Sequence, residues 1–178
     1  MKHINSYFRR VKLLALDVDG VLTDGSIIYD DKGRELKSFN VYDGLGIFIL
    51  SRMGINTVLI SAKKSSILER RAKDMRVKEV IGGILPKRKV INYLMEKYKV
   101  KKEEVCFIGD DLIDLGIMRE VGIPVAVKNA SLPVKREALY VTQNKGGEGA
   151  VREVVELILK AKNLWKKTVK EIDSFLSK

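Results

Sequence analysis

Long apolar runs and paired cysteines are both missing from this sequence of 178 residues. No run reaches eighteen apolar residues, so no membrane-spanning helix and no membrane partner is expected. The first ten residues lack the apolar core of a signal peptide. The single cysteine, Cys106, lies in an apolar run, where it is expected to fill the core. These absences favour a cytoplasmic protein without disulfides.

Aromatic residues are scarce where positive charge is concentrated. The chain has a formal net charge of +11, and residues 63–102 hold fourteen Lys or Arg against four acids. A surface that binds nucleic acid usually interleaves aromatic and basic side chains, but this segment offers only Tyr93 and Tyr98. A solvated basic surface is the ordinary explanation, and attraction of an anionic substrate is the favoured functional one. We expect no nucleic-acid partner, and keep a nucleic-acid-binding or interaction protein as the alternative to an enzyme.

Two acids follow the first strong apolar run of the chain. Residues 11–16 are long enough for a strand buried on both faces, and Asp17, Asp19 and Gly20 come directly after it. Alternation along a strand puts Asp17 and Asp19 on the same side, where two carboxylates repel unless a cation or a proton separates them. A solvated turn is the alternative; a calcium loop fails because a buried strand precedes the acids.

A second apolar run ends in the same way. Residues 104–108 lead into Gly109, Asp110 and Asp111. Two strands that each deliver acids at their carboxyl ends predict one metal site above the sheet.

Apolar runs alternate with helical patterns along the whole chain, which predicts an α/β fold with a doubly wound parallel sheet. We expect a single domain over residues 1–178, with a β-hairpin insertion at about 25–40 after the first strand. Asp43 is expected to cap the next helix, and Pro86 is expected to open a later one. Residues 163–178 are predicted to form a C-terminal helical extension with an apolar stripe of Trp165, Val169, Ile172 and Leu176.

Four short motifs, taken in order, resemble those of the haloacid dehalogenase superfamily. They are Asp17-Val-Asp19-Gly20, Ser61, Lys87 and Gly109-Asp110-Asp111-Leu-Ile-Asp114. Finer likeness, including Phe39-Asn-Val-Tyr-Asp43-Gly and Gly146-Gly-Glu-Gly149, is to phosphatases of 3-deoxy-D-manno-octulosonate (Kdo) 8-phosphate. The resemblance implies a Rossmann-like, capless fold, a sugar-acid phosphate substrate used in lipopolysaccharide precursor synthesis, and a homotetramer. A phosphatase of nine-carbon keto-sugar acid 9-phosphates, or of another small phosphate monoester, is the alternative.

The resemblance also implies catalytic roles. Asp17 would attack phosphorus and form an aspartyl-phosphate, and Asp19 would act as general acid and then general base. Ser61 and Lys87 would bind the phosphoryl group, although Ser61 could instead cap the following helix. Substrate contacts are expected from Ser61, Ala62, Lys63 and Lys87. The family usually has Gly-Arg after the motif serine, so Lys63 keeps the charge but loses the arginine fork.

A magnesium site is implied at the same place. Mg²⁺ prefers oxygen ligands, and the expected ones are the Asp17 carboxylate, the Asp19 main-chain carbonyl and Asp110. Asp111 and Asp114 are expected as outer-shell supports of the metal. For Asp114 the alternative is an acid that merely favours the helix dipole.

Overall fold

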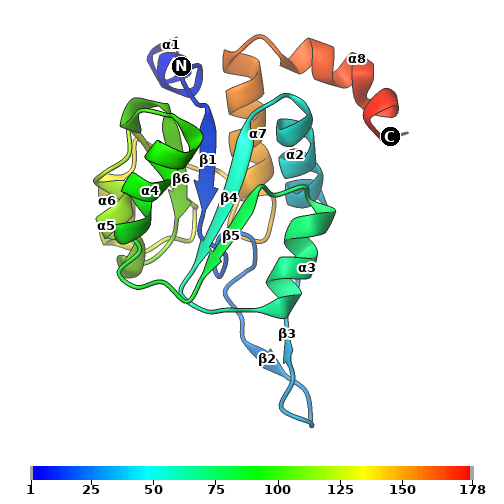
Figure 1. Cartoon of the computed structure of the whole chain (residues 1–178), viewed down its shortest axis with the longest axis vertical. Coiled ribbons are helices and arrows are strands. Elements are labelled where there is room, and N and C mark those ends of the chain that lie inside the picture. Colours follow the sequence, from blue (N-terminus) through cyan, green and yellow to red (C-terminus); the bar gives the residue numbers. More distant parts are fainter. Residues whose placement is uncertain (1, 177–178) are drawn as a thin grey trace.

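The computed structural model describes residues 2–176 and contains one parallel sheet of six strands, in the order β5-β4-β1-β6-β7-β8 (Figure 1). The predicted doubly wound α/β fold is therefore confirmed. The strands are β1 (Leu13–Leu16), β4 (Asn56–Ser61), β5 (Glu79–Gly82), β6 (Val105–Gly109), β7 (Ile123–Ala126) and β8 (Tyr140–Val141).

Helices cover both faces of the sheet (Figure 1). One face carries α2 and α7, which pack against each other, together with α1 and α3; the other face carries α4, α5 and α6. The helices are α1 (Lys2–Phe8), α2 (Val41–Arg52), α3 (Ser66–Asp74), α4 (Lys89–Tyr98), α5 (Leu115–Met118), α6 (Leu132–Glu137), α7 (Ala150–Ala161) and α8 (Trp165–Leu176). Among the described residues, no helix is long and apolar enough to span a membrane.

The central strands place the functional edge of the sheet. Every residue of β1 and β6 is buried, as their unbroken apolar runs require. Leu16 pairs with Leu59 on one side and with Ile108 on the other, so the carboxyl ends of three strands lie level. From β1 the chain runs outward through β4 and β5, then returns to build β6, β7 and β8 on the other side of β1. The gap between the ends of β1 and β6 is thus a topological switch point, where such sheets bind ligands.

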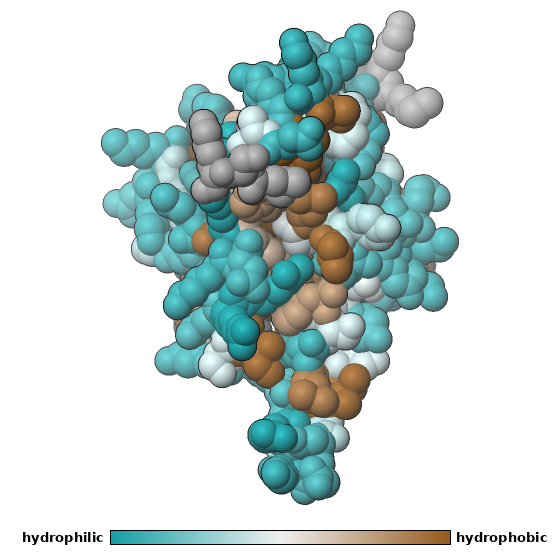
Figure 2. Space-filling model, turned by 90° about the vertical axis from the view of Figure 1, so that its right-hand side faces the viewer, coloured by the Kyte–Doolittle hydropathy of each residue, from teal (hydrophilic) through white to brown (hydrophobic). Residues whose placement is uncertain are grey.

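The hairpin predicted at 25–40 is present as β2 (Ile28–Tyr29) and β3 (Glu35–Leu36), which project from the carboxyl edge of the sheet (Figure 1). Its turn closes where the sequence indicated, with Gly33 N donating to Asp30 O at 3.0 Å. Ile28, Tyr29 and Leu36 are exposed on it. Figure 2 shows apolar side chains gathered where the hairpin meets the body of the molecule. Between β1 and β4 the chain forms only this hairpin and α2.

Asp43 does not cap α2, and this expectation was wrong. The N-cap is Asn40, whose side chain accepts hydrogen bonds from the main-chain N–H groups of Tyr42 and Asp43. The Asp43 carboxylate instead accepts from Gly149 N at 3.3 Å and from Arg152 N at 2.7 Å, so it caps α7. Burial raises the pKa of Asp43 above its ordinary value, although these main-chain hydrogen bonds oppose the rise.

Two further boundaries differ from the sequence-based expectation. Helix α4 begins at Lys89, not at Pro86, and a hydrogen bond from Lys89 N to Pro86 O closes a turn ahead of it. The C-terminal extension does form a helix, α8, in which Trp165 and Ile172 pack against the core while Val169 is 56% exposed. Residues 1, 177 and 178, and the Leu176 side chain of the expected stripe, lie outside the described part of the protein.

Candidate active site

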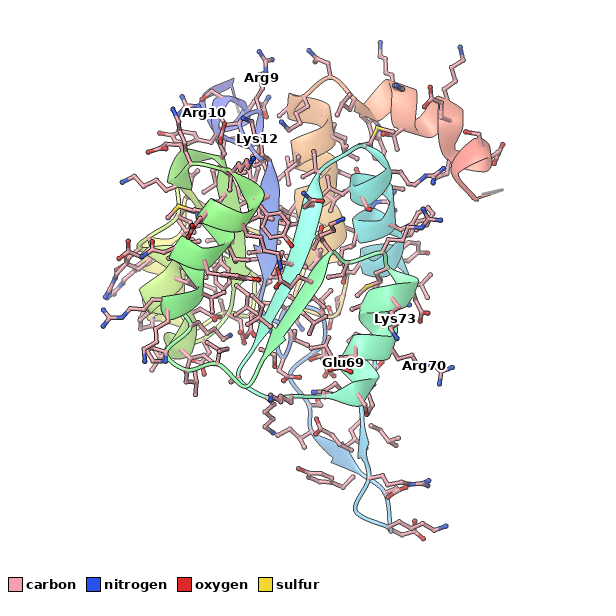
Figure 3. All side chains as sticks on the ribbon, viewed as in Figure 1. Arg9, Arg10, Lys12, Glu69, Arg70 and Lys73 are labelled. Carbon is pink, nitrogen blue, oxygen red and sulfur yellow. The ribbon has the colours of Figure 1, made fainter. Side chains whose placement is uncertain are left out.

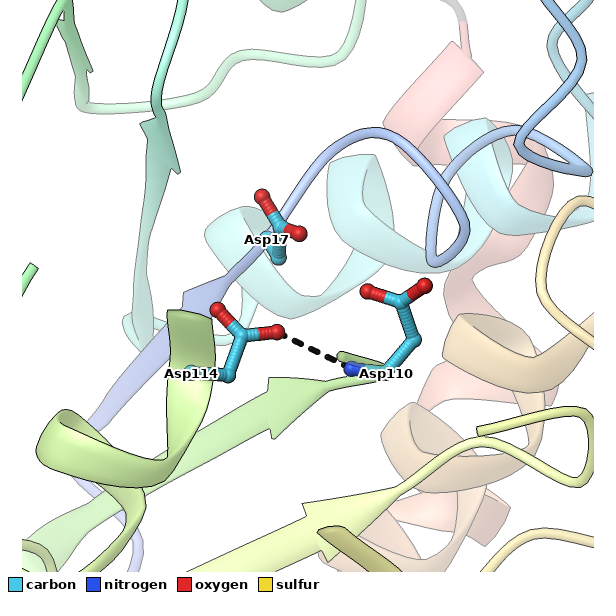
Figure 4. Close-up of side chains that lie close together, drawn as sticks. All are labelled: Asp17, Asp110 and Asp114. Carbon is cyan, nitrogen blue, oxygen red and sulfur yellow. Dashed lines mark hydrogen bonds between the residues drawn. The ribbon is translucent and has the colours of Figure 1, made fainter. Parts of the chain in front are cut away.

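Three carboxylates meet at the switch point of the sheet (Figure 4). Asp17 follows β1 and Asp110 follows β6, while Asp114 reaches back from the end of a short 3₁₀ turn, Leu112–Asp114. One carboxylate oxygen from each lies within 4.8 Å of the other two. The two acidic strand ends singled out in the sequence thus come together, and an acid expected only as a support joins them.

Lys87 supplies the positive charge of this group. Its side chain is fully buried, with Nζ 2.6 Å from Asp17 Oδ1 and 2.7 Å from Asp114 Oδ1. Burial by itself lowers the pKa of a lysine, but the two carboxylates, Asp17 foremost, outweigh it and raise the pKa of Lys87. The ammonium therefore stays charged beside Asp17.

The acids carry more negative charge than one lysine can balance. Burial, with the charge of Asp114 added, raises the pKa of Asp17 to about 6. Burial, followed by the charge of Asp17, raises the pKa of Asp110 to about 8. Oδ1 of Asp110 is buried and has no hydrogen-bond partner in the described structure. A hard cation bound by Asp17 and Asp110 would reduce the repulsion between their carboxylates and give the unpaired Asp110 oxygen a partner. These oxygen ligands therefore fit Mg²⁺.

Asp114 and Asp111 differ in their surroundings, although both were expected as outer supports. Asp114 is fully buried, and its Oδ2 accepts from Asp110 N at 3.0 Å, the contact drawn in Figure 4. It therefore holds Lys87 with one oxygen and the main chain of Asp110 with the other. Asp111 is exposed and accepts from Leu112 N at 2.8 Å, which caps the short 3₁₀ turn.

Asp19 lies at the rim of the site and makes a contact that sequence reasoning missed. Its side chain is 43% exposed, and its Oδ1 is 2.5 Å from Nζ of Lys37, which comes from the hairpin. Lys37 also pairs with Glu35 at 2.9 Å and is itself only 6% exposed. The sequence could have indicated this contact through alternation along the second hairpin strand, which puts Glu35 and Lys37 on the face opposite the exposed Leu36.

Ser61 is buried at the end of β4, the strand beside β1. It does not cap α3, because Ser65 does, accepting from Leu68 N at 3.3 Å. Ser61 Oγ accepts instead from Lys63 N at 3.2 Å across Ala62. Lys63 is exposed and lines, with Lys64 and the loop after β5, a hollow of about 720 Å³.

Glycines let the loops of the site approach one another. Gly20 has a φ of +88°, and a Cβ there would lie 2.0 Å from Asp110 Oδ2. A Cβ on Gly146 would lie 1.7 Å from the carbonyl oxygen of Gly20. The loop before α7 therefore packs directly on the loop after β1, which gives Gly146 a structural role within its own chain.

The basic residues are not all directed at this site. Arg9, Arg10 and Lys12 lie at the amino end of β1, the end opposite Asp17 (Figure 3). Arg70 and Lys73 are exposed on α3 (Figure 3). Much of the excess charge therefore lies on solvated surface, the ordinary explanation favoured by the sequence.

A buried carboxylate after β1, a buried lysine and an acidic pair after β6 are typical of one class of hydrolase, and the comparison with known families agrees. A model of haloacid dehalogenase-like hydrolases matches residues 54–154, and the chain belongs to this family. Within it, the chain is similar to 3-deoxy-D-manno-octulosonate 8-phosphate phosphatases. The protein of that name from Yersinia pestis is 42% identical over 153 residues, covering 86% of this chain and 82% of that protein.

Solved structures point to the same relatives. The Kdo 8-phosphate phosphatase of Moraxella catarrhalis, in complex with magnesium, phosphate and Kdo, has a TM-score of 0.93 and 39% identity. The match covers 97% of this chain and 99% of that one. The cobalt-bound enzyme of Haemophilus influenzae has a TM-score of 0.85 and 39% identity, over 88% of this chain and 92% of that one.

Proposed function

We propose that this chain is a Mg²⁺-dependent phosphatase that hydrolyses Kdo 8-phosphate to Kdo and inorganic phosphate. The observation that carries the proposal is the meeting of Asp17, Lys87 and Asp110 at the switch point, in a chain that matches the Moraxella enzyme over 97% of its length. By this function the protein would serve lipopolysaccharide precursor synthesis.

In the first displacement, the Asp17 carboxylate attacks phosphorus and the bond from phosphorus to the sugar oxygen breaks. Asp19 gives its proton to that oxygen, so the sugar leaves as an alcohol and Asp17 carries the phosphoryl group. Lys87 lies 2.6 Å from Asp17 Oδ1, where it holds the attacking carboxylate and balances negative charge.

In the second displacement, water attacks the phosphorus of the aspartyl-phosphate. Asp19, now a carboxylate, takes a proton from this water, and the bond between Asp17 and phosphorus breaks. Inorganic phosphate leaves, and both carboxyl groups return to their starting states. Dividing the reaction in this way replaces one very slow hydrolysis with two easier transfers.

Mg²⁺ would be held by the carboxylates of Asp17 and Asp110 and by the main-chain carbonyl of Asp19. When bound, it neutralises charge between the nucleophile and the phosphoryl oxygens. Asp114 would orient Asp110 from outside the metal shell, since both its oxygens are engaged by Lys87 and by Asp110 N. Asp111 would support the metal through a bound water.

Substrate recognition would come from the residues after β4. Ser61 Oγ would donate to a phosphoryl oxygen, and the Ala62–Lys63 segment would face the sugar acid, with Lys63 attracting its carboxylate. Without an inserted cap, this site would be completed by neighbouring subunits. We therefore propose a homotetramer whose subunit contacts include the exposed apolar side chains of the hairpin. We also propose that each chain is a single domain and that the protein is cytoplasmic.

A panel of phosphate monoesters tests the substrate. With Mg²⁺ present, kcat/KM for Kdo 8-phosphate should exceed that for a nine-carbon keto-sugar acid 9-phosphate and for simple sugar phosphates by tenfold or more, on the order of 1.4 kcal/mol. A clear preference for the nine-carbon ester would assign the chain to that substrate instead. Failure to release phosphate from any ester would overturn the proposed function.

A further inference from the structure

The contact between Lys37 and Asp19 joins two parts of the chain that the catalytic scheme leaves separate. Lys37 follows β3 of the hairpin directly, whereas Asp19 belongs to the loop after β1. The ammonium sits between two carboxylates, at 2.5 Å from Asp19 Oδ1 and 2.9 Å from Glu35 Oε1. Lys37 therefore has a partner on its own hairpin and a partner in the site.

Burying the charged Lys37 side chain and fixing its conformation both cost free energy, which its ion pairs must offset. Its side chain is 6% exposed, and a lysine loses about 2 kcal/mol of side-chain entropy when it is fixed. On the opposite face of the same strand, Leu36 is 52% exposed. Alternation along the strand turns Lys37 to the face opposite Leu36, and there its ammonium is shielded from water and paired with Asp19.

Asp19 needs such a contact more than the other acids do. Asp17 is 5% exposed and held by Lys87, and Asp114 is fully buried. The Asp19 side chain is 43% exposed, and Lys37 is the cation that pairs with it in the described structure. An aspartate at a rim, left alone, can turn among its staggered rotamers. Proton transfer needs its oxygen within hydrogen-bond reach of the leaving oxygen.

We propose that Lys37 is a positioning residue, which holds the Asp19 carboxyl group in the orientation from which it transfers protons. Glu35 fixes Lys37 from the other side. This inference rests on the proposed function, because it assumes that Asp19 is the general acid and base. Lys37 contributes to turnover through Asp19 and not through binding of the substrate, since its ammonium is held between two carboxylates of the protein itself.

The Lys37→Met variant tests this role, because methionine keeps most of the side-chain length and removes the charge. For Kdo 8-phosphate, kcat should fall roughly tenfold to a hundredfold, a part of what general acid–base catalysis supplies, while KM changes by less than about threefold. For 4-nitrophenyl phosphate, whose leaving group needs no proton, kcat/KM should fall much less. Lys32→Met is the matched control on the same hairpin, where the exposed lysine should be replaceable without loss.

Two more variants keep the test decisive. Lys37→Arg should restore part of kcat, and Glu35→Gln, which keeps Lys37, should lower kcat in the same direction by a smaller factor. In an Asp19→Asn background, Lys37→Met should have little further effect, since the group it positions is gone.

Several outcomes would overturn the inference while leaving the phosphatase in place. A rise in KM with unchanged kcat would make Lys37 a substrate-binding residue. Equal losses on both esters, or losses that multiply with Asp19→Asn, would make its role one of general structure. Wild-type protein that fails to hydrolyse Kdo 8-phosphate would instead refute the proposed function, and the two failures are therefore distinguishable.

Discussion

Nζ of Lys87 lies 2.6 Å from Oδ1 of Asp17, and both side chains are buried. The contact links the end of β1 to the turn before α4, so the proposed nucleophile and its counter-charge come from segments seventy residues apart in the chain. A buried pair of this kind keeps its geometry because each partner would otherwise remain an unpaired charge away from water. The site is therefore organised before substrate arrives.

Lys87→Met should disable the enzyme and destabilise the fold. Loss of the ammonium removes charge balance from the transition state, and kcat should fall by about 10²–10³. It also leaves Asp17 and Asp114 facing each other unpaired, which should lower the free energy of unfolding by about 3–5 kcal/mol. Phosphate release and urea unfolding measure the two effects. Lys89→Met, two residues on and exposed, is the control and should change neither; an active Lys87→Met protein would contradict the assignment.

Asp110→Ala should act on the metal. It removes a proposed carboxylate ligand of the metal, so the Mg²⁺ concentration that gives half-maximal activity should rise at least tenfold, about 1.4 kcal/mol of binding free energy. Titration of activity with Mg²⁺ after chelation measures this shift. Asp111→Ala, whose exposed carboxylate caps the 3₁₀ turn, should shift it far less. Activity that survives exhaustive chelation in the wild-type protein would rule out the metal site.

Local sequence patterns predicted the sheet and the two acidic strand ends, because buried parallel strands and their terminal acids are properties of short segments. They could not choose the cap of α2. Asn40 and Asp43 are both good N-cap residues, and the choice depends on α7, whose Arg152 N lies 2.7 Å from the Asp43 carboxylate. That contact spans 109 residues and leaves no trace in either segment alone.

The same limit applies to the site. Asp17, Asp19 and Asp110 follow from their positions after strands, and Lys87 follows from family resemblance. The contact of Lys37 with Asp19 depends on how the hairpin folds back over the loop after β1, which neither segment specifies. The central place of Asp114 also depends on how the 3₁₀ turn closes beneath Asp110.

Asp43→Ala should destabilise the protein without changing the residues proposed to carry out catalysis. The variant leaves Gly149 N and Arg152 N without their acceptor at the start of α7, which should lower the free energy of unfolding by about 1–2 kcal/mol. Urea unfolding measures this. A stability equal to that of wild type would show that the α7 N-terminus is satisfied in another way.

The pH dependence of stability checks the Asp43 environment. Because burial raises the pKa of Asp43, the folded chain holds this proton more tightly than the unfolded chain. The contribution of Asp43 to the free energy of unfolding is therefore full below about pH 4 and is lost as the pH rises through the folded-state pKa of Asp43. The stability of wild type relative to Asp43→Asn should fall over that range. A relative stability that rises with pH would mean that the hydrogen bonds outweigh burial.

Ile28→Glu should weaken assembly. The Ile28 side chain is 47% exposed on the hairpin, and a charge there would be costly to bury between subunits. Sedimentation equilibrium should show a tetramer for wild type and smaller species for the variant, with lower turnover of Kdo 8-phosphate. Lys32→Glu at the hairpin turn is the control for added negative charge. A wild-type protein that is a fully active monomer would refute assembly as part of the site.

Asp17 is the centre of the account, and the most direct test is kcat/KM for Kdo 8-phosphate in wild-type and Asp17→Asn proteins under saturating Mg²⁺. Asparagine keeps the size of the side chain and removes the attacking charge. Wild type should reach on the order of 10⁴ M⁻¹s⁻¹ or more, and Asp17→Asn should fall by at least about 10³ while its thermal unfolding stays cooperative. An Asp17→Asn protein that keeps a tenth of the wild-type rate would contradict attack by Asp17 and the phosphatase mechanism built on it.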